Sequence, residues 1–226
     1  MRSYTYWVRS AFYLSKTEWR KGDRMQPAGN YYDKYHTRNP IARALMRGFL
    51  GAFEHLAQKA GPVGRALEIG CGEGELSMRL SQAGWQIRGC DIAPEAVAEA
   101  RRRAMRAGLD IPFAVKDIFD DPTSLEPANL VVCCEVLEHL DDPDAAVRIL
   151  SQLSQQYVLV SVPREPLWRA LNLARGRYIR DMGNTPGHVQ HWSAPAFLAM
   201  LDRHLDVVET RFPLPWTMVL CRVRRA

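Results

Sequence analysis

The sequence predicts a doubly wound α/β fold: one domain with a seven-stranded, mostly parallel sheet that ends in an antiparallel strand. Three observations support this prediction. Short apolar segments alternate with helical patterns along most of the chain, and a glycine-rich turn joins the first such segment to the next helix. The last two strand-like segments are joined by a link too short for a crossover, so they must pair antiparallel. At 226 residues, we expect one buried core rather than two.

The elements follow one another in the order that a parallel sheet requires. The expected strands are residues 66–69, 85–91, 111–117, 128–134, 157–162, 205–210 and 216–221. Helical patterns cover residues 41–58, a run from 76, 94–107, 143–153, a short stretch at 167–173 and a run from 193. Right-handed crossovers place the carboxyl ends of parallel strands at one edge of the sheet. We therefore expect a ligand at that edge.

The glycine-rich turn has the composition of a nucleotide site. Gly70, Gly72 and Gly74 follow the first strand at alternate positions. A backbone that bends from strand to helix and lies against a ligand has no room for β-carbons. Asp91 ends the second strand, 21 positions after Gly70, where a carboxylate in such folds accepts both ribose hydroxyls. The order of strand, turn, helix, strand and acid predicts an adenosine-containing ligand.

The bulk composition indicates a cytoplasmic protein. Hydrophobic residues make up 47% of the chain and its mean hydropathy is −0.26. No apolar run approaches the roughly 20 residues of a membrane span, and the N-terminus lacks the apolar core of a signal peptide. The five cysteines lie in or beside strand-like segments, without metal-ligand spacing and in odd number. We expect buried thiols in a reducing compartment, no disulfide framework and no metal site.

The positive charge is concentrated at the N-terminus. The net charge is +5 and the isoelectric point is near 9.1. Residues 1–30 contain six basic and two acidic side chains and end in a cluster of helix-breaking residues, so we interpret them as an N-terminal extension to a domain over residues 31–226. The domain itself is nearly balanced in charge, which disfavours a nucleic-acid partner.

Four motifs in succession resemble those of class I S-adenosylmethionine-dependent methyltransferases. They are Leu67-Glu68-Ile69-Gly70-Cys71-Gly72-Glu73-Gly74, Asp91, Asp117 and Cys134-Glu135-Val136-Leu137-Glu138-His139-Leu140, each after one of the first four strands. The nearest-looking branch comprises small-molecule methyltransferases similar to the ubiquinone-pathway O-methyltransferases. The resemblance covers roughly residues 67–162 and implies a Rossmann-like fold. Because the match is poor outside that span, we do not carry over the ubiquinone enzymes' substrate.

The resemblance implies S-adenosylmethionine as the cofactor and assigns residues to it. Glu68 would face the ammonium group, Asp91 would hold the ribose hydroxyls and Ile92 would pack on the adenine. Asp117 would accept from the adenine amine, beside the backbone amide of Ile118. The complete set implied is Glu68, Gly70, Cys71, Gly72, Gly74, Asp91, Ile92, Asp117, Ile118, Glu135 and Val136. For Asp117 and Glu135 the alternative is a solvated acid in a turn.

Residues 163–192 interrupt the alternation after the fifth strand, and we interpret them as an acceptor-site insertion with a lid loop. Methyl transfer to a hydroxyl needs a proton acceptor, a role that suits histidine near neutral pH. His188 and His191 in the insertion are the preferred candidates. His139 is the third, although a structural role is favoured for it. Arginines in the insertion could hold an anionic acceptor, but a solvated face is the simpler explanation.

Other functions stay open at this point. A dehydrogenase would use the same glycine turn but would not need Asp117 or the 135–140 run. An RNA or protein methyltransferase would share the cofactor site, and a non-catalytic S-adenosylmethionine-binding module would not need the histidine-bearing insertion. We expect a methyltransferase that acts on a small-molecule acceptor, at a hydroxyl. The sequence predicts neither the acceptor nor the oligomeric state.

Overall fold

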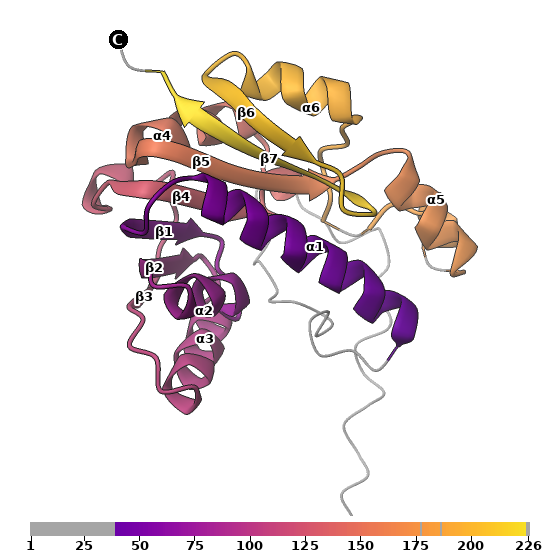
Figure 1. Cartoon of the computed structure of the whole chain (residues 1–226). Coiled ribbons are helices and arrows are strands. Elements are labelled where there is room, and N and C mark those ends of the chain that lie inside the picture. The colour runs from indigo at the N-terminus through magenta and orange to yellow at the C-terminus, as the bar shows by residue number, and fades with distance from the viewer. Residues whose placement is uncertain (1–38, 177, 186, 225–226) are drawn as a thin grey trace, which may run out of the picture.

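The computed structural model describes residues 39–176, 178–185 and 187–224, so the expected extension over residues 1–30 lies outside the described part. The described residues form one seven-stranded sheet in the order β3-β2-β1-β4-β5-β7-β6 (Figure 1). The strands are β1 (Arg65–Ile69), β2 (Gln86–Asp91), β3 (Phe113–Val115), β4 (Ala128–Cys134), β5 (Ser154–Pro163), β6 (Leu205–Arg211) and β7 (Trp216–Val223).

The pairing confirms the predicted architecture. Strands β1 to β5 are parallel to one another, whereas β7 lies antiparallel between β5 and β6. Strand β3 is shorter than predicted because Pro112 has no amide hydrogen to donate to the ladder. Strand β5 begins three residues earlier than predicted. Ser154, which directly follows helix α4 (Pro143–Leu153), already pairs with Ala128 of β4.

The described residues form six α-helices (Figure 1). They are α1 (Pro40–Lys59), α2 (Glu75–Gln82), α3 (Pro94–Arg106), α4 (Pro143–Leu153), α5 (Leu167–Ala174) and α6 (Ala194–Leu201), with 3₁₀ turns η1 (Pro122–Ser124), η2 (Leu137–His139) and η3 (Ile179–Asp181). Helices α1 to α3 pack on one face of the sheet, α4 and α6 pack on the other, and α5 lies beyond the ends of the strands (Figure 1). Helix α1 starts where its sequence predicts: the Asn39 side chain accepts from the amides of Ile41 and Ala42, and Pro40 occupies the first turn.

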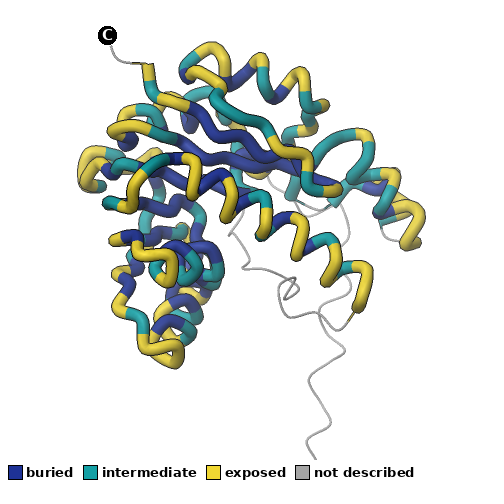
Figure 2. Tube along the Cα trace, viewed as in Figure 1, coloured by how far each residue is buried: buried dark blue, intermediate teal, exposed yellow. Residues whose placement is uncertain are grey.

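The core lies on both faces of the central strands, which are buried along their length (Figure 2). In β4, Leu130 and Val132 belong to the cluster under α1 to α3, whereas Val131 and Cys133 belong to the cluster under α4 and α6. A strand buried on both faces explains the continuous apolar run that the sequence shows there. All five cysteines are free and buried, as predicted. Among the described residues, no helix is both long and apolar enough to cross a bilayer.

The sheet order brings the sequence motifs to a common edge. Strands β1 and β4 are neighbours at the centre of the sheet, with β2 beyond β1 and β5 beyond β4. The glycine turn follows β1, and residues 135–140 follow β4. Because both strands run in the same direction, these two loops face each other across the carboxyl edge.

Candidate functional site

The glycine turn has the backbone that its sequence requires. Gly70, Gly72 and Gly74 have φ values of +71°, +52° and +82°, in the left-handed region that side chains disfavour. A β-carbon on Gly70 would also collide with Cγ2 of Val136. One on Gly74 would lie 3.1 Å from Cβ of Ala100. At least two of the glycines are therefore needed for packing within the protein. This reason adds to the one that the sequence suggested, which was the close approach of a ligand.

Asp91 ties the glycine turn to the end of β2. Its Oδ2 accepts from the amide of Gly72 at 2.8 Å, and its Oδ1 accepts from the amide of Ala93 at 2.9 Å. Each carboxylate oxygen has two lone pairs, so both can accept a further hydrogen bond from ribose hydroxyls. The adjacent Ile92 is 46% exposed and offers an apolar surface beside this carboxylate. The pair fits the ribose and the base of an adenosine.

Glu68 lies in the interior, beneath the glycine turn. It is only 3% exposed, and its carboxyl group is hydrogen-bonded to the hydroxyl of Ser77 on α2. Burial raises the pKa of Glu68 to about 8, because desolvation penalises the charged form. In this structure the side chain faces Ser77 rather than the surface, so a direct ionic contact with a ligand's ammonium stays a prediction.

Three further residues of the predicted cofactor set lie after β3 or within the glycine turn. Asp117 follows β3, and its Oδ1 accepts from the amide of Phe119 at 2.9 Å. The side chain of Ile118 is buried in the core, which leaves its backbone as the group available to a ligand, as the resemblance implied. Cys71 is buried with its thiol near the carbonyl of Gly72, and burial raises the pKa of that thiol.

Glu135 stands at the tip of β4 in a conformation that only a few per cent of residues adopt. Its φ is +61°, although it has a side chain. Its Oε1 accepts from the hydroxyl of Ser161 on β5 at 3.1 Å, and its Oε2 accepts from Nε1 of Trp216 on β7 at 2.5 Å. Trp216 carries no local signal in the sequence, because nothing there shows that the start of β7, one strand beyond β5, lies within reach of Glu135.

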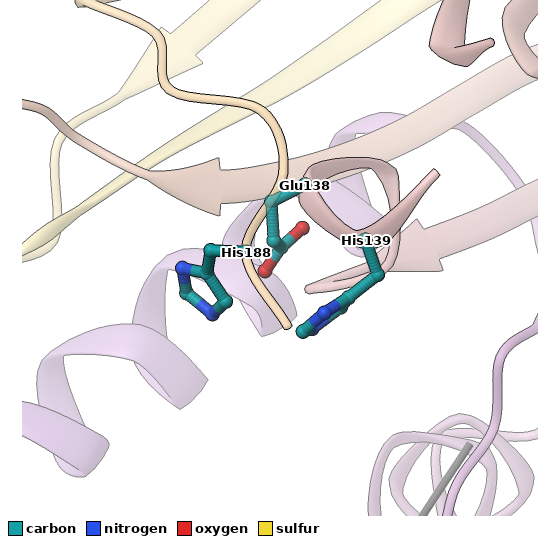
Figure 3. Close-up of side chains that lie close together, drawn as sticks. All are labelled: Glu138, His139 and His188. Atoms are coloured by element: carbon teal, nitrogen blue, oxygen red, sulfur yellow. The ribbon is translucent and has the colours of Figure 1, made fainter. Parts of the chain in front are cut away.

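The fold brings together two of the three predicted histidines (Figure 3). The rings of His139 and His188 meet edge to face, with centroids 4.9 Å apart. Nδ1 of His139 lies 2.9 Å from the carbonyl oxygen of Gly187. A carbonyl only accepts, so Nδ1 carries the proton and Nε2 is the basic nitrogen.

The insertion reaches this place by bonding to η2. The amides of Val189 and Gln190 both donate to the carbonyl of Glu138, at 2.9 and 3.0 Å. The Trp168 ring of α5 stacks on His188, with centroids 5.9 Å apart. The third histidine, His191, lies instead against Asn184, with its Nε2 2.7 Å from Oδ1 of that residue.

Glu138 joins the two histidines and was not among the predicted site residues. It is 2% exposed, and its carboxylate and the imidazole nitrogens of His139 and His188 lie within 4.8 Å of one another. Carboxylate and imidazole are ligands that divalent transition metals accept, so this group could hold an ion. The expectation of no metal rested on the cysteines, which lack metal-ligand spacing. His188 is far from Glu138 and His139 along the chain, so the adjacent Glu138-His139 pair was the available signal.

Comparison with known proteins identifies the family of this arrangement. A family model described as a methyltransferase domain matches residues 36–207. The chain is 31% identical over 175 residues to a ubiquinone biosynthesis O-methyltransferase of Xanthomonas axonopodis pv. citri, covering 72% of each protein. A protein of the same name from Xanthomonas euvesicatoria pv. vesicatoria is 32% identical over 162 residues, covering 67% of each.

Solved structures share the fold at lower identity. Magnesium protoporphyrin IX methyltransferase from Synechocystis, with bound S-adenosylhomocysteine, has a TM-score of 0.65 at 19% identity and covers 84% of this chain and 90% of its own. The N-methyltransferase NodS from Bradyrhizobium japonicum, also with S-adenosylhomocysteine, has a TM-score of 0.61 at 22% identity and covers 83% of this chain and 90% of its own. Because the family model spans most of the chain and the related sequences exceed 30% identity, this chain belongs to the S-adenosylmethionine-dependent methyltransferases.

Proposed function

We propose that this methyltransferase methylates a hydroxyl group of a small-molecule acceptor, with His139 and His188 as the proton-accepting pair. The related sequences are named as O-methyltransferases, which supports oxygen as the methylated atom. The observation that carries the proposal is the contact between the two histidines beyond β4, made only because the insertion folds back onto η2.

The proposed proton transfer follows from the tautomer of His139. S-adenosylmethionine supplies a methyl group on a positively charged sulfur. The acceptor hydroxyl gives its proton to Nε2 of His139 while its oxygen bonds to the methyl carbon, and the bond from that carbon to sulfur breaks with its electron pair staying on sulfur. The Gly187 carbonyl holds the imidazole ring in orientation. His188 packs against the edge of this imidazole and positions it. The products are the methyl ether, S-adenosylhomocysteine and one proton.

The residues proposed to hold the cofactor surround the carboxyl ends of β1, β2 and β4. Asp91 would accept from the ribose hydroxyls and Ile92 would cover the adenine, beside Asp117. Glu135 and Val136 would line the side of the methionine chain, opposite the glycine turn. Holding both partners in one alignment contributes on the order of 7 to 11 kcal/mol to such reactions, so these positions matter as much as the base.

Alanine variants of the histidines test the proposal. Release of S-adenosylhomocysteine is measured with a panel of hydroxylated metabolites, and cofactor affinity is measured by calorimetry. We expect His139→Ala and His188→Ala to lower turnover at least 100-fold with cofactor affinity within twofold of wild type. His191→Ala shows whether the third predicted histidine takes part, and His55→Ala is the matched control because His55 pairs with Glu209 on β6. Wild-type turnover of both His139→Ala and His188→Ala would exclude the proposed pair.

A second mechanism is favoured by the Glu138, His139 and His188 cluster. A divalent ion held by these three side chains would lower the pKa of a bound hydroxyl and replace the histidine as the activating group. The same alanine variants would then lose activity, but through loss of the ion. Metal removal distinguishes the two mechanisms, and its expected outcome is given in the Discussion.

A further inference from the structure

We infer that Trp216 is a positioning residue for cofactor binding, which acts by holding Glu135 at the tip of β4. The inference rests on the proposed place of Glu135 and Val136 beside the cofactor. Trp216 begins β7, 81 positions from Glu135 in sequence, and is 4% exposed. It belongs to none of the motifs that follow β1 to β4.

The first step is the anchoring of the Glu135 side chain. A left-handed φ of +61° is unfavourable for a residue with a β-carbon, so neighbouring groups must hold it there. The amide of Glu135 donates to the carbonyl of Ser161 at 3.0 Å, and the Ser161 hydroxyl donates to Oε1 at 3.1 Å. The indole N–H of Trp216 donates to Oε2 at 2.5 Å. A hydrogen bond to a charged, partly buried group is among the stronger ones.

The second step connects this anchor to the glycine turn. Val136 follows Glu135 directly, and its Cγ2 occupies the space that a β-carbon on Gly70 would need. A change in the backbone at Glu135 therefore moves Val136 against the first glycine of the cofactor turn. Interiors packed this closely transmit such a displacement rather than absorb it.

The third step separates the N–H of Trp216 from the rest of its ring. The ring contacts Phe49 of α1 edge to face at 5.0 Å and lies 5.8 Å from Trp168 of the insertion. A phenylalanine at this position keeps an aromatic ring in these contacts but has no N–H to donate. Trp216→Phe thus tests the hydrogen bond to Glu135 rather than the packing.

Calorimetric titration of the full chain with S-adenosylhomocysteine tests the inference. We expect Trp216→Phe to raise the Kd about tenfold, because the half-buried carboxylate of Glu135 loses a charge-assisted hydrogen-bond donor. Ser161→Ala removes a second side-chain donor to Glu135 and should also raise the Kd. Trp85→Phe is the matched control, because Trp85 is equally buried but precedes β2, at the opposite edge of the sheet. The Kd of this variant should match that of wild type. Thermal unfolding verifies that each variant is folded.

The Glu135→Ala background separates failure of the inference from failure of the proposed site. There, the added Trp216→Phe change should have no further effect on the Kd, since the anchored carboxylate is gone. If Glu135→Ala weakens binding but Trp216→Phe stays within twofold of wild type, the inference is overturned and the site stands. If Glu135→Ala itself binds like wild type, the proposed place of Glu135 is wrong and the inference falls with it.

Discussion

Two proposed regions of this methyltransferase are built in different ways. One is the cofactor edge, formed by the glycine turn, Asp91 and Val136, and the other is the acceptor insertion over residues 163–192. At the cofactor edge, backbone amides donate to the carboxylate of Asp91, and the glycine turn packs without gaps against Val136. The insertion is held to the domain by backbone hydrogen bonds to η2 and by ring contacts of His188, and it leaves Ile179 and Met182 exposed by 65% and 69%. The structure of the first region is determined by short-range geometry and close packing. The structure of the second is determined by long-range contacts, which can change without changing the first region. Substitutions should therefore separate cofactor binding from acceptor turnover.

The largest effect is expected for Gly70→Ala, at the closest contact of the cofactor edge. The new β-carbon would meet Val136 and would force a side chain into a φ of +71°. We expect a loss of about 3 kcal/mol in the free energy of unfolding and of most cofactor affinity. Gly108→Ala is the control for backbone strain alone, because Gly108 has a φ of +68° with open space around it, and it should lose about 1 kcal/mol. Urea unfolding measures the free energy of unfolding, and calorimetry measures cofactor affinity. Equal losses of unfolding free energy in Gly70→Ala and Gly108→Ala would contradict the packing argument.

Glu68→Gln, beneath the glycine turn, should remove a pH dependence from the free energy of unfolding. The folded-state pKa of about 8 lies above the ordinary value of 4.5, so between these values the folded protein keeps a proton that the unfolded chain has released. The unfolded state binds fewer protons there, so the wild-type free energy of unfolding falls as pH rises from about 4.5 to about 8 and is then constant. Glutamine cannot ionise, so the variant lacks this decline.

Between pH 4.5 and pH 9, wild type should lose roughly 4 kcal/mol of its free energy of unfolding through this group, a loss that Glu68→Gln should not show. Urea unfolding of both proteins across this range measures the difference. Parallel curves for the two proteins would show that the Glu68 carboxyl does not keep its proton in the folded state.

Asn172→Ala tests the insertion without touching the cofactor edge. The buried Asn172 side chain on α5 donates to the carbonyl of Gly183 at 2.9 Å and to the hydroxyl of Thr185 at 3.2 Å, in the loop that carries His188. We expect turnover to fall about tenfold while the Kd for S-adenosylhomocysteine stays within twofold. Asn129→Ala is the matched control, since its side chain accepts from the amide of Arg65 at the far edge of the sheet. A matching loss of cofactor affinity in Asn172→Ala would show that the two regions are not independent.

Metal removal should have the smallest effect. If His139 is the proton acceptor, dialysis against EDTA leaves turnover unchanged, as the sequence-based expectation of no metal requires. Loss of turnover with EDTA and its return with added Zn²⁺ would favour the metal-assisted mechanism at Glu138, His139 and His188. His188→Ala would then also bind Zn²⁺ more weakly than His55→Ala.

The sequence by itself determined the sheet, its helices and the cofactor edge, because each depends on signals within a few residues. The order of apolar segments, the spacing of Gly70, Gly72 and Gly74, and the acid at Asp91 all act through local backbone geometry. The extents of β3 and β5 were predicted less well, since they depend on which neighbour can pair with each end.

Only the tertiary structure decided which side chains from distant segments meet. Trp216 reaches Glu135 because β7 lies next to β5, and His188 reaches His139 because residues 187–190 bond to η2. His191, three residues further on, turns to Asn184 instead. Such contacts depend on the path of the whole chain rather than on composition or spacing, so the residues that complete the candidate site could be recognised only once the sheet and the insertion were in place.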